Sequence, residues 1–124
     1  MDRDHVVRRA LWTSVFFNAG GALLFAFPES IGSWVGLPAP VPRLYSVTLA
    51  FFVLLFGGTY LWLVLQARLD RPLVGFAAIG KGGFFVVALL CWLAGEAPGL
   101  GVVGAAGDLA LASVFAWWLV STRV

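Results

Sequence analysis

The sequence predicts an all-α membrane protein, an antiparallel bundle of four transmembrane helices formed by a single domain. Of the 124 residues, 61% are hydrophobic and only 11% are charged, whereas soluble domains carry about 25% charged residues. So few polar side chains cannot cover a water-soluble surface, and lipid must therefore solvate the chain. The apolar residues also fall into four long stretches with short polar breaks, which leaves no room for a second, soluble domain.

The first helix is predicted over residues 10–27, where an apolar stretch follows Arg8 and Arg9. It ends at Pro28, because proline lacks the N–H that continues a helix and clashes with the preceding turn. The stretch is too long for the hydrophobic region of a signal peptide and has no small-x-small cleavage site at its end. We therefore expect it to remain in the protein as a helix.

Three further helices are predicted over residues 44–65, 73–94 and 100–120. Pro72 precedes the second of these, near a helix start, where proline is favoured. Each stretch is close to the roughly 20 residues that cross a hydrocarbon layer of about 30 Å, and the first helix is the shortest. Helices are expected because lipid offers no partner to an unpaired backbone group.

The long loop over residues 28–43 is apolar for a connecting segment. Its residues Ile31, Trp34, Val35 and Leu37 favour a short amphipathic turn, and the prolines that follow enforce an extended exit. Two interpretations stay open. The turn either lies on the membrane surface or forms a lid over a ligand cavity.

Basic residues outside the predicted helices gather on one side of the bundle. Arg43 alone lies on the side of the long loop, and the other side carries Arg3, Arg8, Arg9, Arg68, Arg71 and Arg123. Because Lys and Arg are retained on the cytoplasmic side, both termini are expected in the cytoplasm. The basic residues are scattered rather than gathered into a patch, so no nucleic-acid partner is expected.

Lys81 and Asp108 are the only charged residues inside the predicted helices. A charge at the bilayer centre costs roughly 3 kcal/mol on insertion scales, so it persists only when it is paired, hydrated or functional. Counting along the helices places Asp108 about 6 Å further from the cytoplasmic side than Lys81, a gap that a lysine side chain spans. The link between the third and fourth helices is short, which makes them antiparallel neighbours. The sequence therefore predicts an ion pair between Lys81 and Asp108.

Three interpretations of these two residues remain open. One is that they have separate partners, with Lys81 extending towards the cytoplasm. The other two treat them as a pair. It is either internal support, in which each charge offsets the desolvation of the other, or part of a polar cavity lined by Lys81, Asp108, Asn18 and Tyr60 that binds a lipophilic molecule or relays protons. Asn18 lies at a depth similar to that of Lys81 in the first helix. Tyr60 lies on a stripe of small and polar residues in the second helix.

Small residues inside the helices are expected to form the surfaces at which helices meet, because they let backbones approach in lipid. On the fourth helix, steps of three and four residues connect Gly101, Gly104, Asp108 and Ala112, which places the carboxylate on such a surface. Most of the glycine is predicted to serve packing, namely Gly20, Gly21, Gly57, Gly58, Gly80, Gly82, Gly83, Gly104 and Gly107.

Other chemistry finds little support in the sequence. The single histidine, His5, lies near the N-terminus, and no His, Cys or carboxylate cluster has the spacing of a metal site. No serine inside a helix has a histidine base, so no catalytic residue is assigned. The single cysteine, Cys91, is expected to be an apolar filler. No cofactor is predicted.

The layout resembles that of small DoxX-like four-helix membrane proteins. The features that carry the resemblance are a first helix ending at Pro28, the external segment Gly36-Leu37-Pro38, and the tight basic link from Arg68 to Pro72. The resemblance implies an inner-membrane bundle of the bacterial type that associates with redox or quinone-linked partners. Small multidrug transporters have a similar size, but they use a carboxylate in the first helix, where this chain offers only Asn18.

These observations predict a non-enzymatic integral membrane protein whose interior holds a lipophilic ligand or receives the helix of a partner. The alternatives are a small proton-coupled transporter, with Asp108 as the titrating group and Lys81 as its counter-charge, and an accessory membrane subunit of a redox or quinone-linked complex. The expected partners are membrane lipid, a lipophilic small molecule, and a second copy of the chain or another membrane protein.

Overall fold

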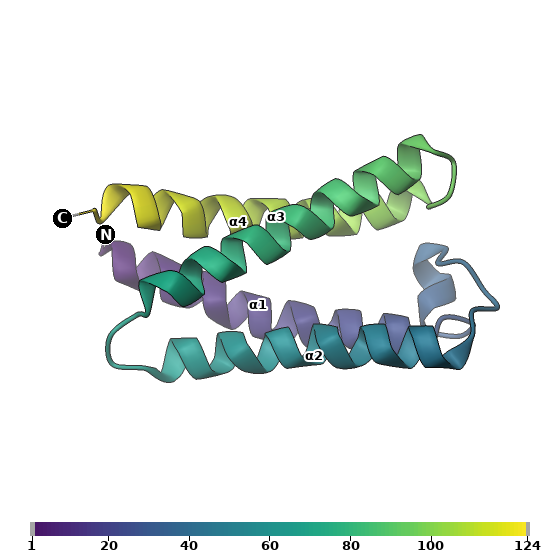
Figure 1. Cartoon of the computed structure of the whole chain (residues 1–124), viewed down its shortest axis with the longest axis horizontal. Coiled ribbons are helices and arrows are strands. Elements are labelled where there is room, and N and C mark those ends of the chain that lie inside the picture. The colour runs from purple at the N-terminus through teal and green to yellow at the C-terminus, as the bar shows by residue number, and fades with distance from the viewer. Residues whose placement is uncertain (1, 124) are drawn as a thin grey trace.

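The computed structural model describes residues 2–123 and contains four long helices. They are α1 (Arg3–Ala26), α2 (Arg43–Leu65), α3 (Arg71–Leu93) and α4 (Gly99–Ser121), and a short 3₁₀ helix, η1 (Gly32–Val35), lies between α1 and α2. Successive long helices run in opposite directions, so both termini lie at one end of the molecule (Figure 1). We call this the terminal end and the opposite end, which holds η1, the loop end. The predicted all-α class is confirmed.

The predicted start of the first helix was wrong. Helix α1 begins at Arg3 rather than at residue 10, because the Asp2 side chain accepts a hydrogen bond from the backbone N–H of Asp4 and caps the helix. Hydropathy marks the segment that prefers lipid, whereas a helix continues for as long as its backbone hydrogen bonds are satisfied. The other helix boundaries lie within two residues of the predicted ones.

Three of the described helices, α2, α3 and α4, are long and apolar enough to cross a membrane. Helix α1 is not one of these three; charged residues up to Arg9 occupy its start, and the polar residues Thr13, Ser14 and Asn18 follow. Large apolar side chains cover the outside of the bundle, with Ile79 76% and Val103 69% exposed. A soluble monomer rarely exposes so much contiguous apolar surface. The molecule is therefore a helical membrane protein.

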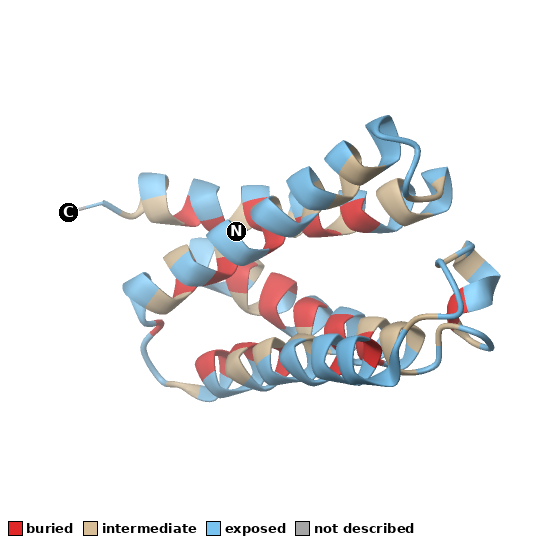
Figure 2. Ribbon diagram, turned by 45° about the vertical axis from the view of Figure 1, so that its right-hand side comes forward, coloured by how far each residue is buried: buried red, intermediate tan, exposed pale blue. Residues whose placement is uncertain are grey.

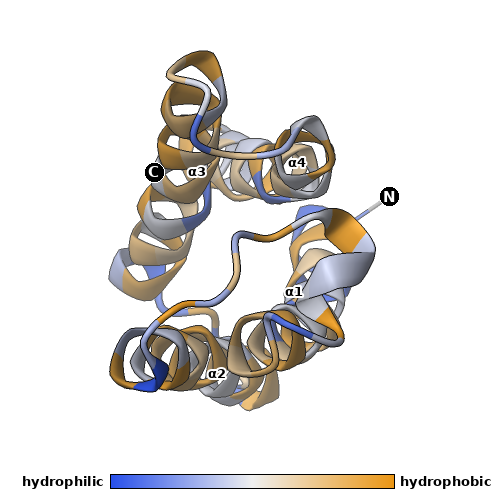
Figure 3. Ribbon diagram, turned by 90° about the vertical axis from the view of Figure 1, so that its right-hand side faces the viewer, coloured by the Kyte–Doolittle hydropathy of each residue, from blue (hydrophilic) through white to orange (hydrophobic). Residues whose placement is uncertain are grey.

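The helices form two hairpins. Helix α1 packs along α2, α3 packs along α4, and α1 also contacts α4, whereas α2 and α3 touch at few positions. The view along the bundle shows the two hairpins facing each other (Figure 3). Contacts of α1 with α4 therefore join the hairpins, and α2 meets α3 towards the terminal end, where the ring centroids of Phe56 and Phe76 lie 5.5 Å apart.

The hydrophobic core lies at the terminal end of the bundle. It is built from the start of α1, the end of α2, the start of α3 and the end of α4, with Leu11, Leu63 and Phe115 completely buried. Towards the loop end the buried apolar residues are small, such as Ala22 and Ala105, and the two hairpins separate (Figures 1 and 2). The bundle thus has a closed half and a hollow half.

Two arginines stabilise helix ends at the terminal end. Arg8 donates hydrogen bonds to the carbonyl oxygens of Val64 and Ala67, at 2.7 and 3.0 Å, and Arg71 donates to that of Leu119 at 2.7 Å. The last carbonyls of a helix lack partners within the helix and carry partial negative charge. The two arginines therefore supply hydrogen-bond donors to carbonyl oxygens at the C-terminal ends of α2 and α4. They also belong to the group of basic residues on one side of the bundle.

Replacing Arg8 with alanine is expected to lower the free energy of unfolding by about 1–2 kcal/mol, because two carbonyls at the end of α2 lose a charged donor. Arg9 is a matched control, since it is exposed and its guanidinium makes no hydrogen bond to the described residues. Unfolding of both variants in mixed detergent micelles measures the difference. Equal stability of Arg8→Ala and Arg9→Ala would show that the Arg8 contacts contribute nothing.

The loop over residues 28–43 closes over the loop end. The predicted turn forms as η1, and Gly36 ends it in a left-handed conformation, with φ 74°, that favours glycine. A Cβ placed on Gly36 would lie 3.3 Å from the side chain of Pro98, in the turn between α3 and α4. Trp34 remains 75% exposed. The loop therefore bridges the two hairpins and also presents an aromatic side chain outward.

Candidate functional site

The predicted ion pair between Lys81 and Asp108 is present in the interior of the bundle. Lys81 Nζ lies 2.8 Å from Asp108 Oδ1, and the two residues are 2% and 6% exposed. The turn between α3 and α4 sets this register: Gly95, with φ 78°, ends α3, and Glu96 N–H bonds back to Cys91 O at 2.8 Å. The short turn makes α3 and α4 antiparallel neighbours, as the sequence predicted.

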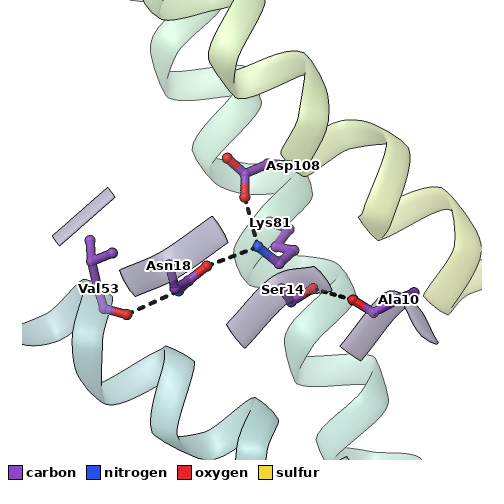
Figure 4. Close-up of polar contacts among 6 residues, drawn as sticks. All are labelled: Ala10, Ser14, Asn18, Val53, Lys81 and Asp108. Atoms are coloured by element: carbon purple, nitrogen blue, oxygen red, sulfur yellow. Dashed lines mark hydrogen bonds and ion pairs between the residues drawn. The ribbon is translucent and has the colours of Figure 1, made fainter. Parts of the chain in front are cut away.

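Asn18 extends the ion pair into a chain of hydrogen bonds through all four long helices. Lys81 Nζ on α3 donates to Asn18 Oδ1 on α1 at 3.1 Å, and Asn18 Nδ2 donates to the backbone carbonyl of Val53 on α2 at 2.9 Å. Asp108 completes the chain from α4 (Figure 4). This polar layer separates the closed half of the bundle from the hollow half. Ser14, one turn before Asn18, donates instead to Ala10 in its own helix.

Two aromatic rings lie next to the ammonium group of Lys81. Its Nζ lies 5.2 Å from the ring centroid of Phe17 and 5.0 Å from that of Tyr60, distances at which a ring face attracts a cation. Tyr60 is 3% exposed, and among the described residues its hydroxyl makes no hydrogen bond. Tyr60 therefore meets Lys81 through its ring. The four predicted site residues thus lie together in one place.

Two glycines allow the helices to approach at this layer. A Cβ on Gly57 would lie 3.1 Å from Asn18 Cβ, and one on Gly107 would lie 2.9 Å from the Phe17 ring. A Cβ at Gly57 would make a tighter contact than nine in ten real Cβ atoms, so Asn18 would have to shift, and a Cβ at Gly107 would force the Phe17 ring to move. Gly57 therefore brings α2 to Asn18, and Gly107 brings α4 to Phe17.

The prediction that most of the glycine serves packing was wrong. A Cβ would meet nothing within 4 Å at Gly20, Gly58, Gly80, Gly83 and Gly104. On α4 the buried small residue is Ala105 rather than the predicted Gly104. Spacing alone does not tell which of two neighbouring small residues faces the bundle, since the crossing of the helices decides this.

Two adjacent cavities lie in the hollow half. The inner cavity has a volume of about 360 Å³, and all four predicted site residues line it. The outer cavity, about 730 Å³, extends to the loop residues Ile31, Trp34 and Leu37. The cavities adjoin along the lining residues that they share, namely Phe17, Gly21, Phe25, Leu49, Phe84 and Asp108. Apart from the polar layer, the side chains that line this space are almost all apolar or aromatic.

Asp108 has one oxygen that is free to interact with a molecule in this space. Its Oδ1 accepts from Lys81, while Oδ2 has no partner among the described residues. Figure 4 shows the second oxygen turned away from Lys81. Asp108 lines both cavities, so its side chain lies where they adjoin.

Several parts of the site escaped the sequence analysis. Phe17, whose ring lies next to the ammonium group of Lys81, was not singled out, and its position beside Asn18 was the signal that could have found it. The carbonyl of Val53 carries no signal at all, because every residue has one. Cys91 was expected to be an apolar filler, and it lines the outer cavity with part of its surface accessible. Residues 2–123 contain no group of three or more His, Cys, Asp or Glu side chains that could hold a metal ion.

Comparison of the chain with protein-family models, with curated proteins and with solved structures finds no match. The resemblance to DoxX-like proteins therefore stays a prediction from layout.

Proposed function

We propose that this protein binds a lipophilic molecule inside its helix bundle, between the polar layer and the loop over residues 28–43. The observation that carries the proposal is the pair of adjacent cavities in the hollow half, which are apolar along their walls and polar at the inner end. Binding sites for small molecules have this composition and volumes of about 300–1,000 Å³. If the ion pair served only to stabilise the bundle, both halves should be closely packed, because packing contacts stabilise helices in lipid.

The sparse contact between α2 and α3 supports entry of the ligand from the membrane. Leu49, Phe52 and Phe84 line the inner cavity and are 41%, 49% and 38% exposed. These side chains are apolar, and α2 and α3 touch at few positions. A lipophilic molecule dissolved in the bilayer therefore reaches the cavity without crossing water.

The proposal includes the placement of the chain in a membrane. All four long helices cross the bilayer, and the terminal end, which carries most of the arginines, faces the cytoplasm. Helix α1 can cross the bilayer although it contains Asn18, because this side chain is buried in the interior of the bundle and does not face lipid. We assign the protein to a bacterial-type inner membrane and to the DoxX-like proteins on the layout of its sequence, with no enzymatic activity of its own.

Filling the inner cavity is expected to remove the bound lipophile. Gly80 lines the inner cavity and has open space where a side chain would begin, so Gly80→Leu places a branched side chain there. Gly83 on the same helix also has open space and does not line the inner cavity, so Gly83→Leu is the matched control. Native mass spectrometry of protein purified in mild detergent counts the lipophilic molecules that remain bound.

We expect wild type and Gly83→Leu to retain a bound molecule and Gly80→Leu to lose most of it. Both variants should unfold at the same detergent concentration as wild type, since neither side chain meets a neighbour. Retention of the same molecule by all three proteins would exclude the inner cavity as its site. The absence of any bound molecule from wild type, even after addition of membrane lipid extract, would contradict the proposed function.

A further inference from the structure

We infer that the ligand is a neutral amphiphile whose head group donates a hydrogen bond to Asp108 Oδ2 and whose apolar tail lies in the outer cavity. This inference rests on the proposed function, and it specifies the chemistry of the molecule that is bound. Three features support the inference. They are the unpaired acceptor oxygen of Asp108, the balance of charge between Lys81 and Asp108, and the shape of the outer cavity.

The first feature is that the carboxylate of the polar layer keeps an unpaired acceptor. Lys81 donates to Asp108 Oδ1 and Asn18 Oδ1, and the rings of Phe17 and Tyr60 lie next to its ammonium group. The amide group of Asn18 donates to Val53 O. Asp108 Oδ2 has no partner among the described residues, and a carboxylate oxygen can only accept. A ligand that satisfies it must therefore bring an O–H or N–H group.

The second feature is that the site is already electrically balanced. Among the described residues, Lys81 and Asp108 are the only charged ones that line either cavity, and they form an ion pair with each other. A cationic head group would place a second positive charge beside Lys81, and an anionic one would lie against the carboxylate. Either would leave an uncompensated charge in an apolar surrounding. A neutral donor, such as an alcohol, avoids this cost.

The third feature is that the space beyond Asp108 is long and apolar. The outer cavity runs from Asp108 to the side chains of Ile31, Trp34 and Leu37 under the loop. A hydrocarbon tail buries its surface there, as it would in lipid. Cys91, the only cysteine of the chain, lines this part of the cavity. Its thiol therefore reports whether a tail is present.

Alkylation of Cys91 by N-ethylmaleimide tests the inference. The full chain is reconstituted in lipid nanodiscs, and four dodecyl probes are added as mole fractions of lipid: 1-dodecanol, dodecyl methyl ether, dodecylamine and dodecanoate. The measured quantity is the probe fraction that halves the alkylation rate. We expect 1-dodecanol to be roughly tenfold more effective than the ether, because only the alcohol donates to the carboxylate. The two charged probes should be weaker than the alcohol.

A variant with Asp108→Asn should reverse the preference. Its carbonyl oxygen still accepts from Lys81, so its NH₂ group turns towards the cavity and donates. The methyl ether accepts this hydrogen bond as readily as the alcohol, and the advantage of the alcohol should disappear. The double variant Lys81→Met, Asp108→Leu keeps an apolar cavity and should bind both probes equally. Alkylation rates without probe, compared with wild type, show whether each variant has kept its fold.

The outcomes separate this inference from the proposed function. Equal protection of Cys91 by the alcohol and the ether in wild type would overturn the assignment of a donor head group. The proposed binding of a lipophile in the cavity would be unaffected. Stronger protection by dodecylamine or dodecanoate would overturn the assignment of a neutral one. Failure of every probe to slow alkylation would contradict both the inference and the binding cavity itself.

Discussion

Replacing Asp108 with alanine is expected to lower the free energy of unfolding by about 3–5 kcal/mol, because the substitution leaves Lys81 as an unpaired charge in the interior of the bundle. Lys81 is 2% exposed, and its remaining polar partner is the oxygen of Asn18. Replacing Lys81 with alanine should cost a similar amount, since Asp108 then loses its counter-charge. Unfolding in mixed micelles with increasing denaturing detergent measures both effects.

The double variant Lys81→Met, Asp108→Leu is expected to recover most of this stability, because a well-packed apolar pair pays no desolvation penalty. The combined cycle of single and double variants measures the coupling between the two residues. Glu96→Ala removes an exposed carboxylate in the α3–α4 turn and serves as a control that should stay within about 0.5 kcal/mol of wild type. If the double variant were as unstable as the two single variants combined, the pair would have no direct coupling.

Replacing Gly57 with leucine is expected to lower the free energy of unfolding by roughly 1–3 kcal/mol, because the new side chain overpacks the contact between α1 and α2. Its Cβ would lie 3.1 Å from Asn18 Cβ, with the carbonyl of Val15 behind it. Displacing Asn18 also weakens its hydrogen bonds to Lys81 and to Val53. The unfolding midpoint in mixed micelles measures the loss.

Gly58 provides a control of the same residue type at the next position of the same helix. A Cβ there meets nothing within 4 Å, so Gly58→Leu should leave stability unchanged or raise it slightly through the better helix propensity of leucine. Equal effects at the two positions would show that loss of glycine, rather than the close approach of α2 to Asn18, determines the result.

The polar layer lies between two halves of the bundle that have different roles. On its terminal side, Leu11, Leu63 and Phe115 pack into a continuous core. On its loop side the buried residues are small and the space stays open. Stability therefore resides mainly in the closed half, which lets the hollow half keep a cavity. Apolar-to-apolar substitutions in the core should reduce stability more than substitutions of the same size in the cavity walls.

Much of the fold followed from local patterns in the sequence. Long apolar stretches predict the helices, since lipid leaves the backbone no other way to satisfy its hydrogen bonds. The beginning of α1 could not be predicted in this way, because it depends on one hydrogen bond to the side chain of Asp2. The short turn between α3 and α4 forces those helices together, so the pairing of Lys81 with Asp108 also followed from sequence.

Contacts between the two hairpins were harder to predict. Asn18 and Lys81 are separated by much of the chain, and matched depth along the helices was the only signal of their hydrogen bond. The positions of Phe17 and Tyr60 around the ammonium group depend on the rotation of α1 and α2 about their axes. Hydropathy does not report that rotation, since in lipid both faces of a helix are apolar.

The sequence by itself determined that this protein is helical, that it belongs in a membrane, and that it carries one pair of opposite charges inside its helices. Composition and chain length suffice for these conclusions. An unpaired backbone group in lipid and an unpaired charge in apolar surroundings are both costly in free energy, whatever the fold. Only the tertiary structure decided which half of the bundle is closed, which glycines bring helices together, and that a cavity lies beside Asp108. These features depend on how the hairpins cross and separate, and contacts between distant segments set that geometry.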